Sequence, residues 1–164
     1  IACALEVARF LKIKEEIIKK AVENFKTISG RLEFVREVRG VKIYNDNNST
    51  TPEATIAALH ALGNPRKNII LIAGGNDKNL KLDKLAKSIN SYCAEVICIP
   101  GTGTEKLRVK SYKVKDLKEA VKIAMTLAKR GDTVLFSPAF SSFSQYNNEY
   151  ERGDEFMKIV KNLK

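Results

Sequence analysis

The sequence predicts an α/β fold, with a Rossmann-like, mostly parallel sheet and flanking helices, preceded by two extra helices. Short apolar runs alternate with segments of helical periodicity, which is the order of a parallel sheet and its crossover helices. The candidate buried strands are short and end near glycine or proline, at residues 68–75, 95–101 and 133–139. With 164 residues, the chain has room for one domain and a short appendage.

The remaining elements follow from the same kind of pattern. Two β-rich runs around Arg39-Gly40 predict a hairpin. Pro52 suits the first turn of a helix, and Asp116 and Gly131 bracket another helix. Helices are predicted at residues 2–12, 14–25, 52–62, 82–90, 116–130 and 151–163.

The first two helices lie outside the alternating pattern, and a link ending in Ser29-Gly30-Arg31 joins them to the sheet. Either they pack on the outer face of the α/β domain, or they are the tail of another domain. The chain starts at Ile1 within a helical pattern, which favours the second interpretation. We therefore place a domain boundary between residues 28 and 29.

The formal net charge of +10 indicates either an anionic partner or a lysine-rich surface. The lysines are scattered over several helices without interleaved aromatic residues, which favours the second interpretation. No apolar run approaches the roughly 18 residues that a membrane span requires. Cys3, Cys93 and Cys98 lack CxxC spacing, so we expect reduced, buried or half-buried thiols in a cytoplasmic protein. His60 is the only histidine, so no metal site is expected.

Polar loops follow three of the predicted strands, at residues 46–50, 74–79 and 137–145. Ligands of parallel α/β sheets bind at the carboxyl ends of the strands, where these loops lie. We therefore expect the three loops to form one candidate site.

Each loop carries groups that suit an anion or a nucleotide. Asp46 can accept hydrogen bonds from ribose hydroxyls or from neighbouring amides. Thr50 and Thr51 precede a helix whose N-terminus suits an anion, although plain helix capping explains them equally well. Lys78 on a glycine-rich loop can neutralise a carboxylate or phosphate, or it can be a solvated turn residue.

The last loop adds hydroxyl and aromatic groups. Ser141 and Ser142 can donate hydrogen bonds to a carboxylate, and Phe143, Tyr146 and Tyr150 can form the wall of a pocket. The chain contains no GxxxxGK[ST] loop, and its GTGT stretch at residues 101–104 is interpreted as a tight turn after a strand.

Five segments, which include the three loops, form a set of motifs along the chain. The set comprises Ser29 to Glu33, Asn45 to Thr55, Ile72 to Lys78, Ser137 to Phe143 and Glu151 to Phe156. In sequence and spacing they resemble the Mur ligase family, and its D-glutamate-adding members most closely. The resemblance covers nearly the whole chain.

The resemblance implies an ATP-dependent ligase that acts with Mg²⁺ in peptidoglycan synthesis. It would form an acyl-phosphate on UDP-N-acetylmuramoyl-L-alanine, which D-glutamate then attacks. Residues 1–28 would be the helical tail of the central, ATP-binding domain, and residues 29–164 the C-terminal domain. The phosphate-binding loop, the metal ligands and the uridine-binding domain would lie in the remaining domains, which are the implied partners. The chain alone is predicted to be inactive, with neither a nucleic acid nor a membrane as partner.

The resemblance also assigns residues. The predicted D-glutamate contacts are Thr50, Lys78, Ser142 and Phe143. The predicted nucleotide contacts are Arg31, Asn45 and Asp46. The chain departs from the pattern of many relatives at Asn48, Ser144 and Asn147, where a loop cation for the substrate is lost.

Two other interpretations stay open. One is the C-terminal domain of another Mur ligase or of a folate-type ligase. The other is a stand-alone basic module that binds nucleotides or nucleic acid, whose binding would weaken steeply with salt.

Overall fold

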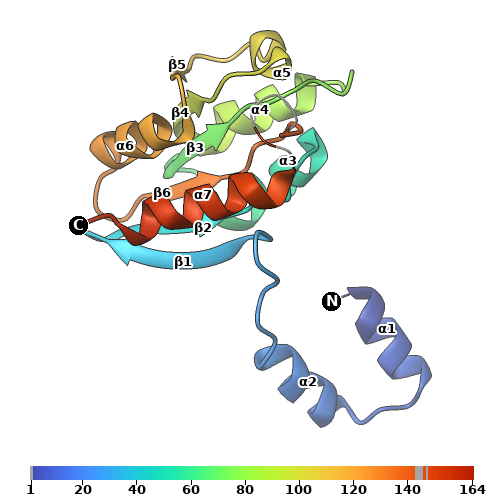
Figure 1. Cartoon of the computed structure of the whole chain (residues 1–164). Coiled ribbons are helices and arrows are strands. Elements are labelled where there is room, and N and C mark those ends of the chain that lie inside the picture. The colour runs from blue at the N-terminus through green and yellow to red at the C-terminus, as the bar shows by residue number, and fades with distance from the viewer. Residues whose placement is uncertain (1, 143–145, 147) are drawn as a thin grey trace.

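The computed structural model describes residues 2–142, 146 and 148–164 (Figure 1). The predictions for Phe143, Ser144 and Asn147 lie outside the described residues. A six-stranded sheet forms the centre of the domain. Its strands are β1 (Glu33–Val38), β2 (Val41–Asn45), β3 (Ile69–Ala73), β4 (Cys93–Cys98), β5 (Tyr112–Lys113) and β6 (Thr133–Phe136).

The strand order is β1-β2-β6-β3-β4-β5, and every neighbouring pair except β1–β2 is parallel. The predicted hairpin is confirmed, because β1 and β2 pair antiparallel around Arg39 and Gly40. Both turn residues have positive φ, 54° and 78°, as a tight two-residue hairpin turn requires. Strand β5 was not predicted, since its two residues are exposed and too few to show a periodic pattern.

The predicted helices are confirmed within a few residues at their ends. They are α1 (Ala2–Phe10), α2 (Glu15–Glu23), α3 (Pro52–Leu62), α4 (Asp83–Tyr92), α6 (Leu117–Leu127) and α7 (Glu149–Lys161). Thr51 caps α3 by accepting from the Ala54 amide at 3.3 Å. The GTGT stretch turns directly into a short helix, α5 (Thr102–Lys106).

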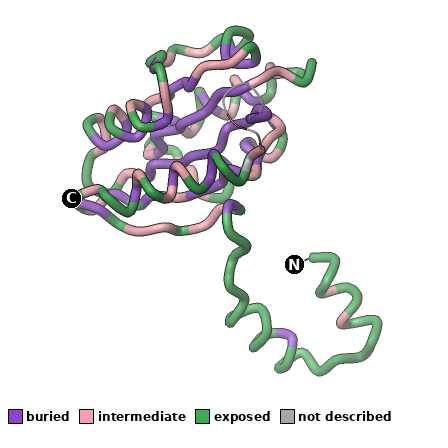
Figure 2. Tube along the Cα trace, in the orientation of Figure 1, coloured by how far each residue is buried: buried purple, intermediate pink, exposed green. Residues whose placement is uncertain are grey.

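The sheet lies between two helical layers, which confirms the α/β fold class. Alternate residues of β3 point to opposite faces. Ile70 and Ile72 pack in the core under α6 and α7. Ile69 and Leu71 pack in the core with α3 and α4. Figure 2 shows buried residues concentrated along the strands between these helices.

Helices α1 and α2 extend away from the sheet domain as a hairpin (Figure 1). Of their described residues only Ile18 is buried, and Figure 2 shows the rest mostly exposed. The expectation that all three cysteines are at least half-buried is wrong for Cys3, which is exposed because α1 has no domain packed against it. Cys93 and Cys98 are buried, and burial raises the pKa of both thiols. Within the described part of the chain, no helix is long and apolar enough to cross a bilayer.

Candidate functional site

The three polar loops meet at the carboxyl ends of the parallel strands, as the sequence predicts. The amide of Asn76 donates to the carbonyl of Ser141 at 2.9 Å, and the Ser141 amide donates back at 3.2 Å. The amide of Ala139 donates to the carbonyl of Ser49 at 2.9 Å. Backbone hydrogen bonds therefore join all three loops into one surface.

Glycine is required where the loop after β3 approaches its neighbours. Gly74 and Gly75 have φ of 127° and 138°, a region that other residues rarely adopt. A Cβ on Gly75 would lie 2.3 Å from the carbonyl oxygen of Ser141, and one on Gly74 would lie 2.3 Å from that of Ile99. These close approaches set the path of the backbone that leads to Lys78.

Thr50 and Lys78, two of the predicted D-glutamate contacts, lie together. The Lys78 Nζ donates to Thr50 Oγ1 at 3.4 Å, and Lys78 is otherwise exposed. Both line a small pocket at the N-terminus of α3. The other lining residues are Pro52, Asn76, Asp77, Leu80, Ala139 and Phe140. The ammonium and the positive end of the helix dipole both favour an anion here.

Ser142, a third predicted contact, is buried and lines a neighbouring small pocket. Tyr146 lines the same pocket, and its hydroxyl donates to Glu155 at 2.7 Å. Burial raises the pKa of Tyr146, and the adjacent carboxylate of Glu155 raises it further, so the phenol stays protonated as a donor. Tyr150, by contrast, is 69% exposed on α7.

Asp46 is the centre of a buried hydrogen-bond network at the end of β2. Its carboxylate accepts from the Ser49 hydroxyl at 2.5 Å, the Ser137 hydroxyl at 2.7 Å and the Leu32 amide at 2.9 Å. Burial raises the pKa of Asp46, while the bonds from Ser49 and Ser137 oppose that shift. The carboxylate thus ties the end of β2 both to β6 and to the link.

The link to the helical hairpin is held against the loop after β2. The Arg31 guanidinium donates to the carbonyl of Asn48 at 2.8 Å and remains exposed. The Asn48 side chain donates to the carbonyl of Ser29 at 3.1 Å, so the residue that departs from the family pattern contacts the link. Asn45, which is buried, donates to the carboxylate of Glu33 at 3.3 Å. The predicted nucleotide contacts Arg31, Asn45 and Asp46 therefore lie around one link.

Sequence reasoning did not assign a role to Arg152, which is fully buried on α7. Its guanidinium donates to the side-chain oxygen of Asn47 at 2.8 Å and to the Asn47 carbonyl at 3.1 Å. It also reaches the carbonyl of Phe140 at 3.4 Å and lies over the ring of Phe136. Arginines on helices are mostly exposed, so the helical pattern gave no sign that Arg152 is buried. Its place in the motif at residues 151–156 was the one signal that it matters. Arg152 thus holds the loops after β2 and β6 together.

Among the residues that the structure describes, no three His, Cys, Asp or Glu side chains cluster as a metal site would require. These residues therefore do not fit a Mg²⁺ ion by themselves. The polar groups at the sheet edge are instead suited to holding an anionic ligand.

Fold and site together define an α/β domain whose strand-end loops present a lysine and a helix N-terminus to an anion. Residues 30–140 match the family described as Mur ligase, glutamate ligase domain. The chain belongs to this family.

Relatives with curated names extend the match to almost the whole chain. The UDP-N-acetylmuramoylalanine–D-glutamate ligase of Roseiflexus sp. (strain RS-1) is 39% identical, over 99% of this chain and 36% of its own length. The enzyme of the same name from Thermoanaerobacter sp. (strain X514) is 40% identical, over 98% and 37%. The chain thus spans little more than a third of the length of these relatives.

Solved structures share the fold. The MurF ligase from Thermotoga maritima in complex with ADP has a TM-score of 0.66 at 24% identity, and the match covers 97% of this chain and 37% of that one. A bifunctional folylpolyglutamate synthase/dihydrofolate synthase with Mn, AMPPNP and L-glutamate bound has a TM-score of 0.52 at 16% identity, covering 70% and 29%. At these identities the likeness concerns the fold alone.

Proposed function

We propose that this chain is the amino-acid-binding part of an ATP-dependent ligase that adds D-glutamate to UDP-N-acetylmuramoyl-L-alanine. The observation that carries the proposal is the contact of Lys78 with Thr50 in a pocket at the N-terminus of α3. The pocket offers a carboxylate a cation, a hydroxyl and the positive end of the helix dipole. The relatives at 39–40% identity, which bear the name of that ligase, support the choice of amino acid.

In this proposal the chain positions D-glutamate and breaks no bond itself. Lys78 pairs with one carboxylate of D-glutamate, and Thr50 donates a hydrogen bond to it. Ser142 and Phe143 remain predicted contacts, with Ser142 in the adjoining pocket. Holding the amine in line with an acyl-phosphate raises the rate through proximity and orientation. Domain closure over the substrates would then exclude water.

We propose that the nucleotide is ATP with Mg²⁺, held mainly by residues outside this chain. ADP, AMPPNP and Mn are bound in the neighbouring structures, which supports this choice. Arg31 is exposed beside the link and can reach a nucleotide. Asn45 and Asp46 are buried and hydrogen-bonded within the chain, so a direct nucleotide contact by either stays a prediction.

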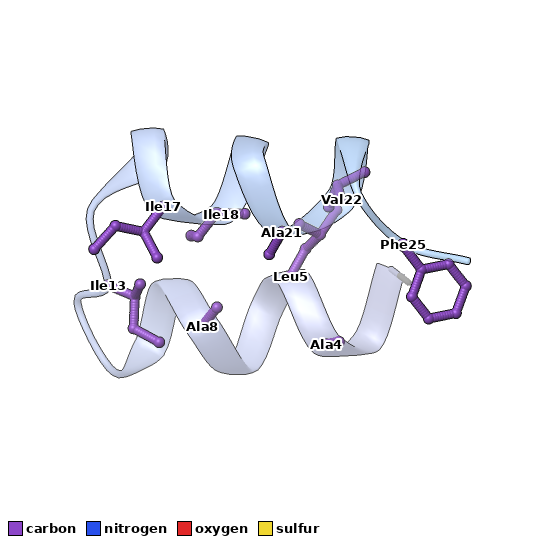
Figure 3. A pocket seen from close by; sticks show the side chains of 9 residues that line it. All are labelled: Ala4, Leu5, Ala8, Ile13, Ile17, Ile18, Ala21, Val22 and Phe25. Atoms are coloured by element: carbon purple, nitrogen blue, oxygen red, sulfur yellow. The ribbon is translucent and has the colours of Figure 1, made fainter. Parts of the chain in front are cut away.

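The helical hairpin is proposed to complete the central domain. Figure 3 shows the apolar side chains of α1 and α2 facing one another across a cleft. Ile17 is 59% exposed and Phe10 is 85% exposed. Exposed apolar surface of this kind marks an interface. We propose that the apolar surface of residues 1–28 packs against the central domain of the ligase. We also propose that this chain alone performs no ligation.

The sister ligases remain the second candidate, because the neighbouring structures include a MurF ligase and folate-type enzymes. A stand-alone nucleic-acid module has only the +10 charge in its favour.

The experiment is a complementation assay. The chain is mixed with the separately purified remaining domains, ATP, Mg²⁺, UDP-N-acetylmuramoyl-L-alanine and one amino acid, and phosphate release is followed. Release that requires D-glutamate and is lost in Lys78→Ala supports the proposal. Lys84→Ala, an exposed lysine on α4, is the matched control. Release with a different amino acid assigns the domain to a sister ligase, and ligation by the chain alone contradicts the proposed division of the site.

A further inference from the structure

An acidic side chain lines the pocket proposed for an acidic substrate. Asp77 precedes Lys78 directly and shares the pocket with Thr50. An ionised carboxylate so close to Lys78 would compete with the substrate for the ammonium and would repel the substrate's own carboxylates. The proposed site therefore needs a group that offsets the charge of Asp77.

Lys106 provides that offset. Its ammonium forms an ion pair with Asp77 Oδ2, and the Asp77 side chain is only 8% exposed. The other oxygen, Oδ1, accepts from the Asn79 amide at 2.9 Å. Each oxygen of Asp77 thus has a partner other than the Lys78 ammonium, which donates to Thr50 instead.

Lys106 is held in place because its short helix is bonded to the glycine loop. The amide of Asp77 donates to Thr102 Oγ1 at 3.1 Å, and the amide of Gly103 donates to the carbonyl of Gly75 at 2.9 Å. These two hydrogen bonds therefore join helix α5 to the loop after β3. The position of Lys106 relative to Asp77 is set by backbone contacts as well as by the ion pair.

We infer that Lys106 is a positioning residue that sets the charge of the amino-acid pocket by neutralising Asp77, so that Lys78 stays available to the substrate carboxylate. The inference rests on the proposed function. Lys78, Asp77 and Lys106 together carry a formal charge of +1, and without Lys106 the charge falls to zero. The hydrogen bond from Lys106 also lowers the pKa of Asp77, which agrees with an ionised carboxylate paired to the ammonium.

The test is a double-mutant cycle in the complete ligase that contains this domain, with KM for D-glutamate, KM for ATP and kcat as readouts. The variants are Lys106→Met, Asp77→Asn and the two combined. Lys110→Met, an exposed lysine four residues further on, is the matched control. The Lys106 side chain is 57% exposed, so the loss of its charge is expected to change KM for D-glutamate by about fivefold.

Lys106→Met should raise KM for D-glutamate about fivefold, leave KM for ATP unchanged and weaken the dependence of KM on salt. The double variant restores the charge of +1, so its KM should return to the wild-type value although the ion pair is gone. Asp77→Asn alone should bind D-glutamate at least as well as wild type. Equal thermal stability of the variants shows that folding is not the cause.

Two results would overturn the inference. One is an unchanged KM in Lys106→Met, and the other is a double variant as impaired as Lys106→Met, since a purely geometric brace would not be rescued by charge. The proposed function has its own readout in the same assay. Wild-type turnover that does not require D-glutamate, or that survives Lys78→Ala, would remove both, whereas turnover dependent on D-glutamate without rescue removes only the role of Lys106.

Discussion

Asp46→Ala tests the claim that the network at the end of β2 stabilises the site. The substitution removes the acceptor of three donors: the Ser49 hydroxyl, the Ser137 hydroxyl and the Leu32 amide. Ser137 has an alternative acceptor, because Thr55 Oγ1 lies 2.8 Å from its hydroxyl and can accept its single proton once the carboxylate is gone. Ser49 and Leu32 are left as the two donors that lose their partner.

The magnitude follows from those two donors. A buried donor without a partner costs about 1–3 kcal/mol. Removing a buried charge returns part of that cost, since burial raises the pKa of Asp46. We therefore expect a loss of about 2–4 kcal/mol in the free energy of unfolding. For a chain of this size the loss lowers Tm by roughly 6–12 °C.

Urea unfolding followed by circular dichroism measures the loss directly. Asp154→Ala, an exposed aspartate on α7, is the control and should change the free energy of unfolding by less than about 0.5 kcal/mol. A loss below about 1 kcal/mol in Asp46→Ala would refute the reasoning, because the two donors would then have found other partners at little cost.

Three further predictions concern the same loops. Because the native pKa of Asp46 is raised, the unfolded state ionises first. The free energy of unfolding of wild type relative to Asp46→Asn should therefore fall as pH rises from about 3.9 through the native pKa; a rise in urea titrations across that window would contradict this. Arg152→Lys should lower the free energy of unfolding in urea by about 2–4 kcal/mol, since an ammonium cannot span both oxygens of Asn47. An unchanged unfolding midpoint would contradict a role for both hydrogen bonds of the guanidinium. Gly75→Ala should lower Tm more than Gly131→Ala, whose Cβ meets nothing within 4 Å; equal shifts in a thermal melt would show that the close approach at Gly75 is unimportant.

Much of the fold was predictable because burial imposes periodicity. The runs that became β3, β4 and β6 are almost wholly apolar, since a parallel strand is covered on both faces. Turn chemistry gave the hairpin at Arg39-Gly40. The two residues of β5 offered no such pattern. The exposure of Cys3 was also missed, because helical periodicity predicts an apolar face without showing what covers it.

The location of the site could be predicted from the sequence, but most of its contacts could not. Strand ends locate the loops, so the meeting of Lys78 with Thr50 follows from topology. The partners of Arg152 and Lys106 did not follow, since each contact joins a helix to a loop distant in sequence. In a sequence, a single arginine or lysine without a known partner is interpreted as a solvated side chain.

Binding of D-glutamate to the chain would show whether the loops around Thr50 and Lys78 form an amino-acid site. D-glutamate is titrated into ¹⁵N-labelled protein, and the amide shifts are followed, with L-glutamate and Lys78→Ala as controls. We expect saturable shifts in the loops around Thr50 and Lys78 that are absent with L-glutamate and in the variant. Shifts confined to other surfaces, or identical shifts in Lys78→Ala, would contradict it.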